Sequence, residues 1–138
     1  MKNNFYFKES FSNIYKLPNR RSEVISQILY GEKFKILSKR KGWIKIKLLY
    51  DRYVGFIKNK NYVNELKITH KVGAIHANIY NKPNNKTLKA LPFGSRLSVI
   101  ERRNSFVRYE NNKWLKLKDI KKINHKEKNF IKIFKTFL

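Results

Sequence analysis

The sequence predicts an all-β chain made of two small β-barrels in tandem, followed by a short C-terminal helix. Three observations lead to this prediction. Apolar residues alternate with polar ones at a spacing of two over much of the chain, which is typical of strands with one buried and one wet face. Glycines stand where successive strands must reverse direction. The pattern of the first half then begins again in the second half, which indicates two similar units.

The strongest strand signal lies in the first half. Residues 33–48 alternate lysines with apolar side chains in two runs separated by Gly42, and Gly31 precedes the first run. A third strand is predicted for residues 53–57, where Gly55 in the middle indicates a bulge, a sharp bend or a close backbone approach. An antiparallel meander this short is too small for a sandwich, so we predict that it closes as a small SH3-like barrel.

The repeat divides the chain. Its offset is 63 residues through the middle (91 − 28) and slips by two in the last hairpin. We therefore predict an N-terminal lead-in over 1–10, a first SH3-like barrel over 11–66, a second over 67–124, and the start of a helix over 125–138, where apolar residues follow helical spacing. The repeated segments are 14–18 with 79–83, 28–37 with 91–100, 42–46 with 105–109, and 53–56 with 114–117.

The charge balance favours an anionic partner. The chain has 33 Lys and Arg residues against 9 Asp and Glu, a formal net charge of +24. A basic excess of this size is typical of proteins that bind nucleic acid or another polyanion. The alternative is compositional, because an AT-rich genome enriches Lys, Asn and Ile in any protein.

The residue content and the apolar runs of the sequence exclude several kinds of site and indicate a location. It has no cysteine, which excludes a thiolate zinc site and a cysteine nucleophile within this sequence. His70, His76 and His125 are its only histidines and have no supporting carboxylate pattern, so we predict neither a metal site nor a cofactor. No apolar run has the length of a membrane helix, and the N-terminus does not resemble a signal peptide. The expected location is the cytoplasm, with association to the cell envelope left open.

The order of these motifs along the chain resembles a known arrangement. The two units are similar to the tandem bacterial SH3 domains that precede the catalytic domain in NlpC-type cysteine peptidases, which cut peptidoglycan peptides, some of them as dipeptidyl-peptidases on murein fragments. Residues 129–138 resemble the first helix of the peptidase domain. The segments that carry the resemblance are 26–32, Gly42-Trp43 and 50–56 in the first unit, and 69–72 and 91–94 in the second.

The resemblance implies a catalytic Cys and two His partners beyond Leu138, and a cysteine peptidase cannot work without that thiolate and imidazole. We therefore expect a non-catalytic module that positions substrate or targets cell-wall peptides. It would be a fragment of such an enzyme, a split-gene product or a stand-alone targeting module. The expected partners are murein peptides and a missing or separately encoded NlpC-type catalytic domain.

The resemblance also implies a ligand site in the first unit. In such enzymes the first SH3 domain can border the active site and help hold the free amino end of the peptide. An aspartate beside aromatic rings can bind an ammonium group in this way. The alternative is that the aromatic residues pack at the core or rim and the aspartate is a turn residue. The candidates are Trp43, Tyr50, Asp51 and Tyr53.

A basic ribbon is the second candidate site. The alternation predicts that Lys33 and Lys35 lie across from Lys45 and Lys47, and like charges that face each other on a hairpin cost a few tenths of a kcal/mol per pair. A bound polyanion relieves that cost, so the alternative function is a nucleic-acid-binding protein of tandem small barrels. The competing interpretation is that exposed lysines splay apart in salt solution. The ribbon consists of Lys33, Lys35, Lys39, Arg40, Lys41, Lys45 and Lys47.

Overall fold

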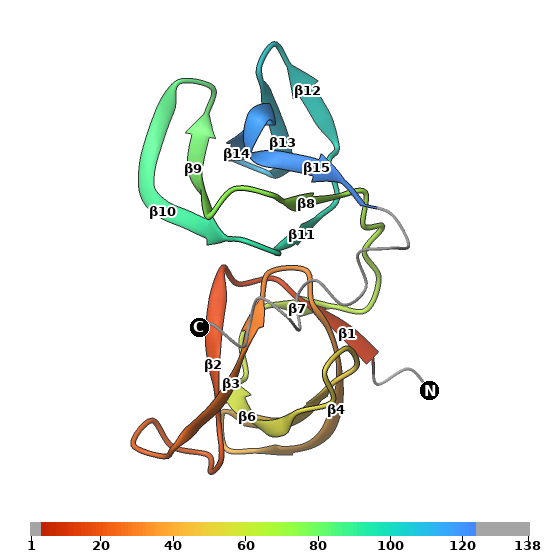
Figure 1. The fold of residues 1–138 in the computed structure, drawn as a ribbon. Helices are drawn as coiled ribbons and strands as arrows, with labels where there is room; N and C mark the ends of the chain where they lie inside the picture. The colour runs from red at the N-terminus through yellow and green to blue at the C-terminus, as the bar shows by residue number, and fades with distance from the viewer. Residues whose placement is uncertain (1–3, 124–138) are drawn as a thin grey trace.

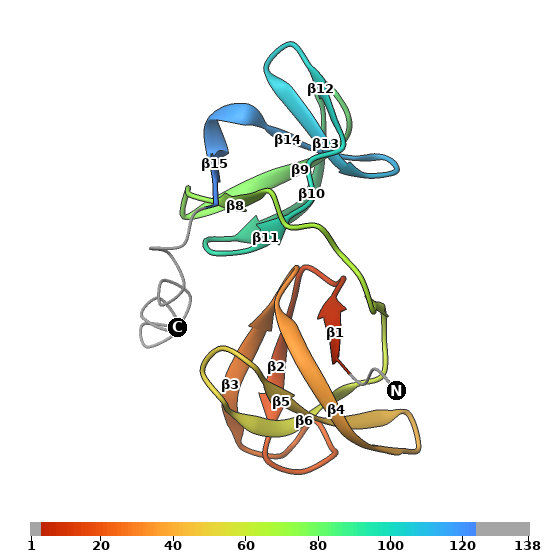
Figure 2. The same ribbon diagram turned by 90° about the vertical axis from the view of Figure 1, so that its right-hand side faces the viewer.

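A computed structural model describes residues 4–123, and these residues form two β lobes, one above the other (Figure 1). The first lobe is residues 4–63 and the second is residues 70–122. An extended segment, residues 64–69, connects them along one side (Figure 2). The all-β prediction is confirmed, and an SH3-like arrangement fits both lobes. The predicted C-terminal helix lies outside the described residues, and the proposed domain limits stay a prediction.

The first lobe is a single curled antiparallel sheet with the strand order β3-β2-β6-β5-β4-β1-β7. Its inward side chains form one apolar core, which includes Phe7, Ile14, Phe34, Ile46 and Ile57. The strands are β1 (Asn4–Phe7), β2 (Phe11–Tyr15), β3 (Val24–Leu29), β4 (Lys33–Arg40), β5 (Trp43–Leu48), β6 (Val54–Lys58) and β7 (Tyr62–Val63).

The second lobe contains two sheets, β10-β9-β14-β13-β12 and β11-β8-β15. They enclose a second core that includes Val72, Ile79, Leu91, Leu97 and Leu115. The elements are β8 (His70–Val72), β9 (His76–Lys82), β10 (Asn85–Pro92), β11 (Arg96–Leu97), β12 (Glu101–Arg103), β13 (Phe106–Glu110), β14 (Lys113–Lys116), a 3₁₀ turn η1 (Leu117–Asp119) and β15 (Ile120–Lys122).

The turn before β4 recurs before β11. Gly31 has φ +78° and its N–H donates to the carbonyl of Phe7 (2.7 Å); Gly94 has φ +88° and its N–H donates to the carbonyl of Val72 (3.0 Å). This correspondence makes β1 the counterpart of β8. The lead-in predicted for residues 1–10 is therefore wrong for Asn4–Phe7, because β1 pairs with both β4 and β7 inside the first sheet.

The sequence alignment of the last hairpin also needs correction. Trp43 pairs with Lys58 across β5 and β6, and its counterpart Phe106 pairs with Lys116 across β13 and β14. The offset there is 58 residues (116 − 58), so Trp114 corresponds to Phe56 and not to a residue of the preceding turn. The cause is the connection, because the turn between β13 and β14 is shorter than the loop between β5 and β6.

The lobes meet through the turn that follows β3. Tyr30 is only 2% exposed and belongs to the apolar core of the second lobe, although it comes from the first. Its ring meets Tyr109 edge to face at 5.1 Å, and its carbonyl accepts a 2.8 Å hydrogen bond from the N–H of Arg96. Beside it, a Cβ on Gly31 would lie 2.0 Å from the carbonyl oxygen of Arg96, so only glycine allows this approach.

A polar cluster completes this contact. The hydroxyl of Tyr30 donates to Glu110, and the Nζ of Lys8 lies 3.1 Å from the same carboxylate. Burial on its own raises the pKa of Glu110, but the hydrogen bonds from Tyr30 and Lys8 outweigh it, so the pKa of this carboxyl lies below its usual value. Burial is the main reason that the pKa of the Tyr30 phenol is raised, and the neighbouring carboxylate of Glu110 raises it further. The phenol therefore stays protonated and donates its hydrogen bond to Glu110.

Candidate ligand-binding site

A cavity of about 620 Å³ lies where the lobes meet. The first lobe contributes β1, the turn before β4 and the loop after β5. The second lobe contributes the start of β11, and the connecting segment closes one side. The lining residues are Tyr6, Gly31, Glu32, Lys33, Leu49, Tyr50, Ile68 and Arg96.

Tyr50 and Arg96 form a stacked pair in this cavity. The centre of the Arg96 guanidinium lies 4.6 Å from the centroid of the Tyr50 ring, within cation–π range. The loop that carries Tyr50 is held by two backbone hydrogen bonds, from Leu48 to Tyr53 (2.9 Å) and from Leu49 to Lys33 (3.3 Å). Because the backbone of Arg96 is bonded to the first lobe, both partners are held at the joint.

The charged side chains around the cavity differ in accessibility. The Nζ of Lys33 lies 5.6 Å from the Tyr6 ring centroid and remains exposed. Glu32 is 1% exposed, and its Oε1 accepts a 3.1 Å hydrogen bond from the N–H of Leu29. A ligand therefore meets the cations of Lys33 and Arg96 before it meets Glu32. This arrangement favours a carboxylate over the ammonium group that the family resemblance implied for the site of Tyr50 and Asp51.

The cavity continues into a second hollow of about 440 Å³, which shares Tyr6 and Lys33 with the first. Its other lining residues come from β1 and the connecting segment, and they include the exposed side chains of Glu65 and Lys67. We call the two adjoining hollows the groove.

Trp43 lies elsewhere. It is 8% exposed on the outer face of β5, where its ring meets Tyr15 edge to face at 5.8 Å and the Nζ of Lys58 lies 5.0 Å from the centroid. It lines a small hollow of about 140 Å³. The second lobe repeats the contact between the counterparts Phe106 and Tyr80, at 5.0 Å. The recurrence indicates a packing role for Trp43.

Asp51 and Tyr53 lie on the loop between β5 and β6. Asp51 is half-buried and Tyr53 is 47% exposed, and neither lines the groove or the small hollow beside Trp43. Arg52 between them has φ +61°, so the loop reverses sharply here. Of the four predicted ligand-binding residues, the structure thus places Tyr50 in the groove and Trp43 apart from it.

The structure brings together only part of the predicted lysine ribbon. Lys35 lies directly across from Lys47. A register shift between Ile36 and Ser38 then places Lys45 opposite Ser38, and Lys33 pairs with Tyr6 on β1. Neither Lys33 nor Lys45 therefore faces a lysine across the hairpin, and for Lys45 the cause is the one extra residue in β4 that changes the register.

Two residues that line the cavity, Arg96 and Tyr6, were not among the site residues predicted from the sequence. Arg96 follows Gly94 by two residues, just as Lys33 follows Gly31, so the repeat itself places two cations at equivalent turns. Tyr6 was not considered because residues 1–10 were predicted to be a lead-in outside the first barrel. No pattern in the sequence indicates that the two turns line one cavity, because that depends on how the lobes meet.

The fold places the chain among small SH3-like β proteins. Residues 14–61, which lie within the first lobe, match the family described as the bacterial dipeptidyl-peptidase SH3 domain. No curated protein matches the chain. Among residues 4–123, no helix has the length and apolar character needed to cross a membrane.

Two solved structures are similar. One is an NlpC/P60 family protein from Bacillus cereus ATCC 10987, with a TM-score of 0.68 and 13% identity over 88% of this chain. This chain spans 56% of that protein's chain, and the similarity establishes the shared fold. The other is NlpC2 from Trichomonas vaginalis, with a TM-score of 0.37 and 14% identity, covering 88% of this chain and 48% of that one.

Proposed function

We propose that this chain is the non-catalytic tandem SH3 module of an NlpC-type murein peptidase and that it positions the peptide substrate beside a separate catalytic domain. The observation that carries the proposal is the match of residues 14–61 to the SH3 domain of bacterial dipeptidyl-peptidases. The sequence has no cysteine, so the thiolate chemistry belongs to the partner domain. The two proposed modules are the first lobe, residues 4–63, and the second lobe, residues 70–122.

The groove along the joint is the proposed peptide site. Murein peptides carry free carboxylates, and Lys33 and Arg96 offer two cations to such a group. Tyr6 and Tyr50 supply ring surface for the apolar part of the peptide. Since the cations come from different lobes, a bound peptide also holds the lobes together.

The test is an NMR titration of the full chain, labelled with ¹⁵N, with a murein tripeptide that has free termini. We expect shift changes at Tyr6, Tyr50 and Arg96, and we expect Arg96→Gln to weaken binding about tenfold through loss of a charge-assisted hydrogen bond. Arg103→Gln is the matched control, because Arg103 also stacks on a ring, Trp114 at 5.2 Å, outside the groove.

Two modified peptides separate the binding modes. Amidation of the peptide carboxylates should abolish binding, whereas acetylation of the peptide's amino terminus should leave the affinity unchanged. The reverse result, with shift changes at Asp51 and Tyr53, would replace the carboxylate site by the ammonium site that the sequence suggested. No binding by any form of the peptide would refute the proposed function. Incubation of the chain alone with the peptide should give no cleavage, since no cysteine is present.

A further inference from the structure

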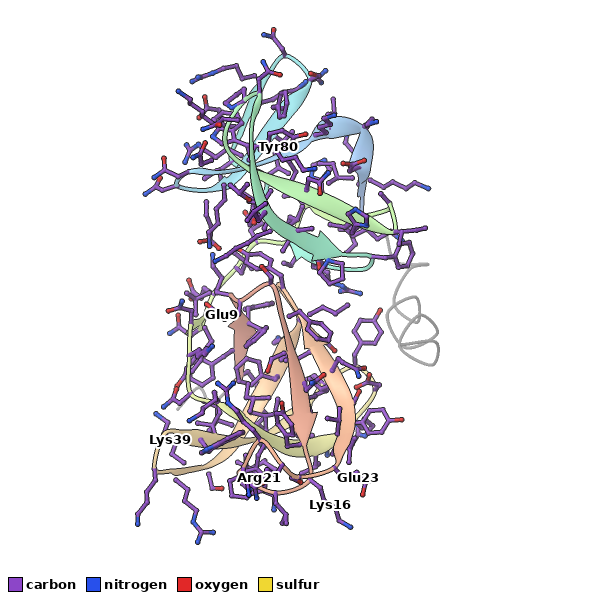
Figure 3. The ribbon with its side chains drawn as sticks, turned by 90° about the vertical axis from the view of Figure 1, so that its left-hand side faces the viewer. Glu9, Lys16, Arg21, Glu23, Lys39 and Tyr80 are labelled. Atoms are coloured by element: carbon purple, nitrogen blue, oxygen red, sulfur yellow. The ribbon has the colours of Figure 1, made fainter. Side chains whose placement is uncertain are left out.

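The outer face of β4 and β5 is a basic surface. Residues 33–48 carry seven Lys and Arg residues and no Asp or Glu. The cross-strand pairs place Lys35 beside Lys47 and Lys45 beside Ser38 on this face, because Phe34, Ile36 and Ile46 point to the core. The ends of the two strands extend beyond the barrel body, where Lys39 projects from the lobe (Figure 3).

These cations are not neutralised within residues 4–123. No ion pair of the described chain joins an acidic side chain to any of the seven. Lys35 and Lys47 therefore face each other with no intervening acid on the same face, which is an unfavourable cross-strand pair in the free protein.

The second lobe provides an internal comparison. The counterparts of Ser38, Lys45 and Lys47 are Glu101, Arg108 and Glu110, each 63 positions later (101 − 38). There Glu101 binds both Arg103 (3.0 Å) and Arg108 (2.9 Å). The hairpin of β12 and β13 in the second lobe thus carries acids among its cations, whereas the equivalent hairpin of β4 and β5 carries cations alone. The contrast concerns these two hairpins, since Lys71 and Lys121 also face each other elsewhere in the second lobe.

Aromatic rings are interleaved with these lysines. The Nζ of Lys33 lies 5.6 Å from the ring centroid of Tyr6, and that of Lys45 lies 6.0 Å from the centroid of Phe56. Both rings are half-buried, so part of each remains open to solvent. Ammonium groups beside open rings match a ligand that alternates phosphates with planar bases.

We propose that the outer face of β4 and β5 binds single-stranded nucleic acid, with its lysines on the phosphates and with Tyr6 and Phe56 as stacking surfaces. An acidic protein offers the negative charge but no repeating planar group, which is why nucleic acid fits this face better. Binding is independent of sequence, because the face has lysines for phosphates and rings for any base.

The test measures fluorescence anisotropy of a labelled single-stranded oligonucleotide with the full chain at several salt concentrations. The double variant Lys35→Glu, Lys47→Glu should bind at least tenfold more weakly. The slope of log K against log salt should become shallower by about 1.4, because two phosphate contacts are lost. The matched control is Lys82→Glu, Lys86→Glu, which changes net charge equally on exposed residues of β9 and β10.

Additional variants and competitors in the same binding assay identify the class of ligand. Phe56→Leu should weaken binding to the oligonucleotide and leave binding to inorganic polyphosphate unchanged. An equal loss in the Lys82→Glu, Lys86→Glu control would overturn the assignment to this face. Equal competition by polyglutamate of the same charge would overturn the assignment to nucleic acid, and absence of binding at low salt would overturn both. Circular dichroism of each variant separates loss of binding from loss of fold.

Discussion

Gly55 shows how one residue determines the packing of the first lobe. A Cβ at this position would lie 2.6 Å from Cγ2 of Ile14 and 2.7 Å from the carbonyl oxygen of Tyr15. Both distances are far below van der Waals contact, and the second atom is backbone, which cannot rotate away. The absence of a side chain is thus what lets β2 cross β6 so closely, as the glycine within a strand pattern predicted.

We therefore expect Gly55→Ala to lower the free energy of unfolding by about 1–3 kcal/mol through overpacking. Urea denaturation followed by circular dichroism measures the change. Gly73→Ala is the control, because its Cβ would meet only the flexible side chain of Lys121 at 3.1 Å. Equal effects of the two substitutions would show that the close approach at Gly55 does not limit stability.

Glu110 makes the joint sensitive to acid. Because the pKa of this carboxyl is lower in the folded protein, its contribution to stability is complete above the usual glutamate value of 4.5. That contribution is lost as the pH falls through the lowered pKa. We expect the free energy of unfolding to decrease in this acidic range, and to decrease less in Glu110→Gln, which cannot be protonated there. Urea titrations at several pH values measure the difference, and identical pH profiles for both proteins would contradict the assignment to Glu110.

At the scale of elements, the sequence was informative wherever one strand carried its own pattern. The alternation over residues 33–48 was sufficient to predict β4 and β5, and the repeat around Gly31 and Gly94 predicted two similar turns. The register shift in β4 was not predictable, because a single extra residue such as Leu37 leaves no separate signal. Arg96 escaped notice as a site residue because a cavity between lobes depends on their relative placement.

β1 was missed for a different reason. Asn4–Phe7 is too short to show a clear period, yet Phe7 is 2% exposed and belongs to the first core. We expect a chain that starts at residue 8 to unfold far more readily than the full chain, with a loss of about 3–5 kcal/mol or more, since it loses this phenylalanine and the pairing to β4 and β7. Phe7→Ala should reproduce most of the loss, as measured by thermal and urea denaturation. A truncated chain of unchanged stability would restore the lead-in interpretation.

At the scale of the whole molecule, one side chain accounts for much of the coupling between the lobes. Tyr30 inserts into the core of the second lobe, and the backbone beside it bonds to Arg96. The chain has two tryptophans, Trp43 in the first lobe and Trp114 in the second, so fluorescence can follow each lobe separately.

We expect the fluorescence of Trp43, recorded in a Trp114→Phe background, and that of Trp114, recorded in a Trp43→Phe background, to report the same urea midpoint. Tyr30→Ala removes a buried ring and should cost about 3–5 kcal/mol, which separates the two midpoints because each core then unfolds without the other. Tyr30→Phe keeps the ring and loses only the bond to Glu110, so it should cost about 1.5–3 kcal/mol and leave the midpoints together. If the midpoints already differ without a change at Tyr30, the lobes are energetically independent, and a groove that needs both of them cannot be preformed. The peptide site and the joint therefore depend on the same residue, and a loss of coupling in Tyr30→Ala should appear as a loss of peptide affinity with Lys33 and Arg96 intact.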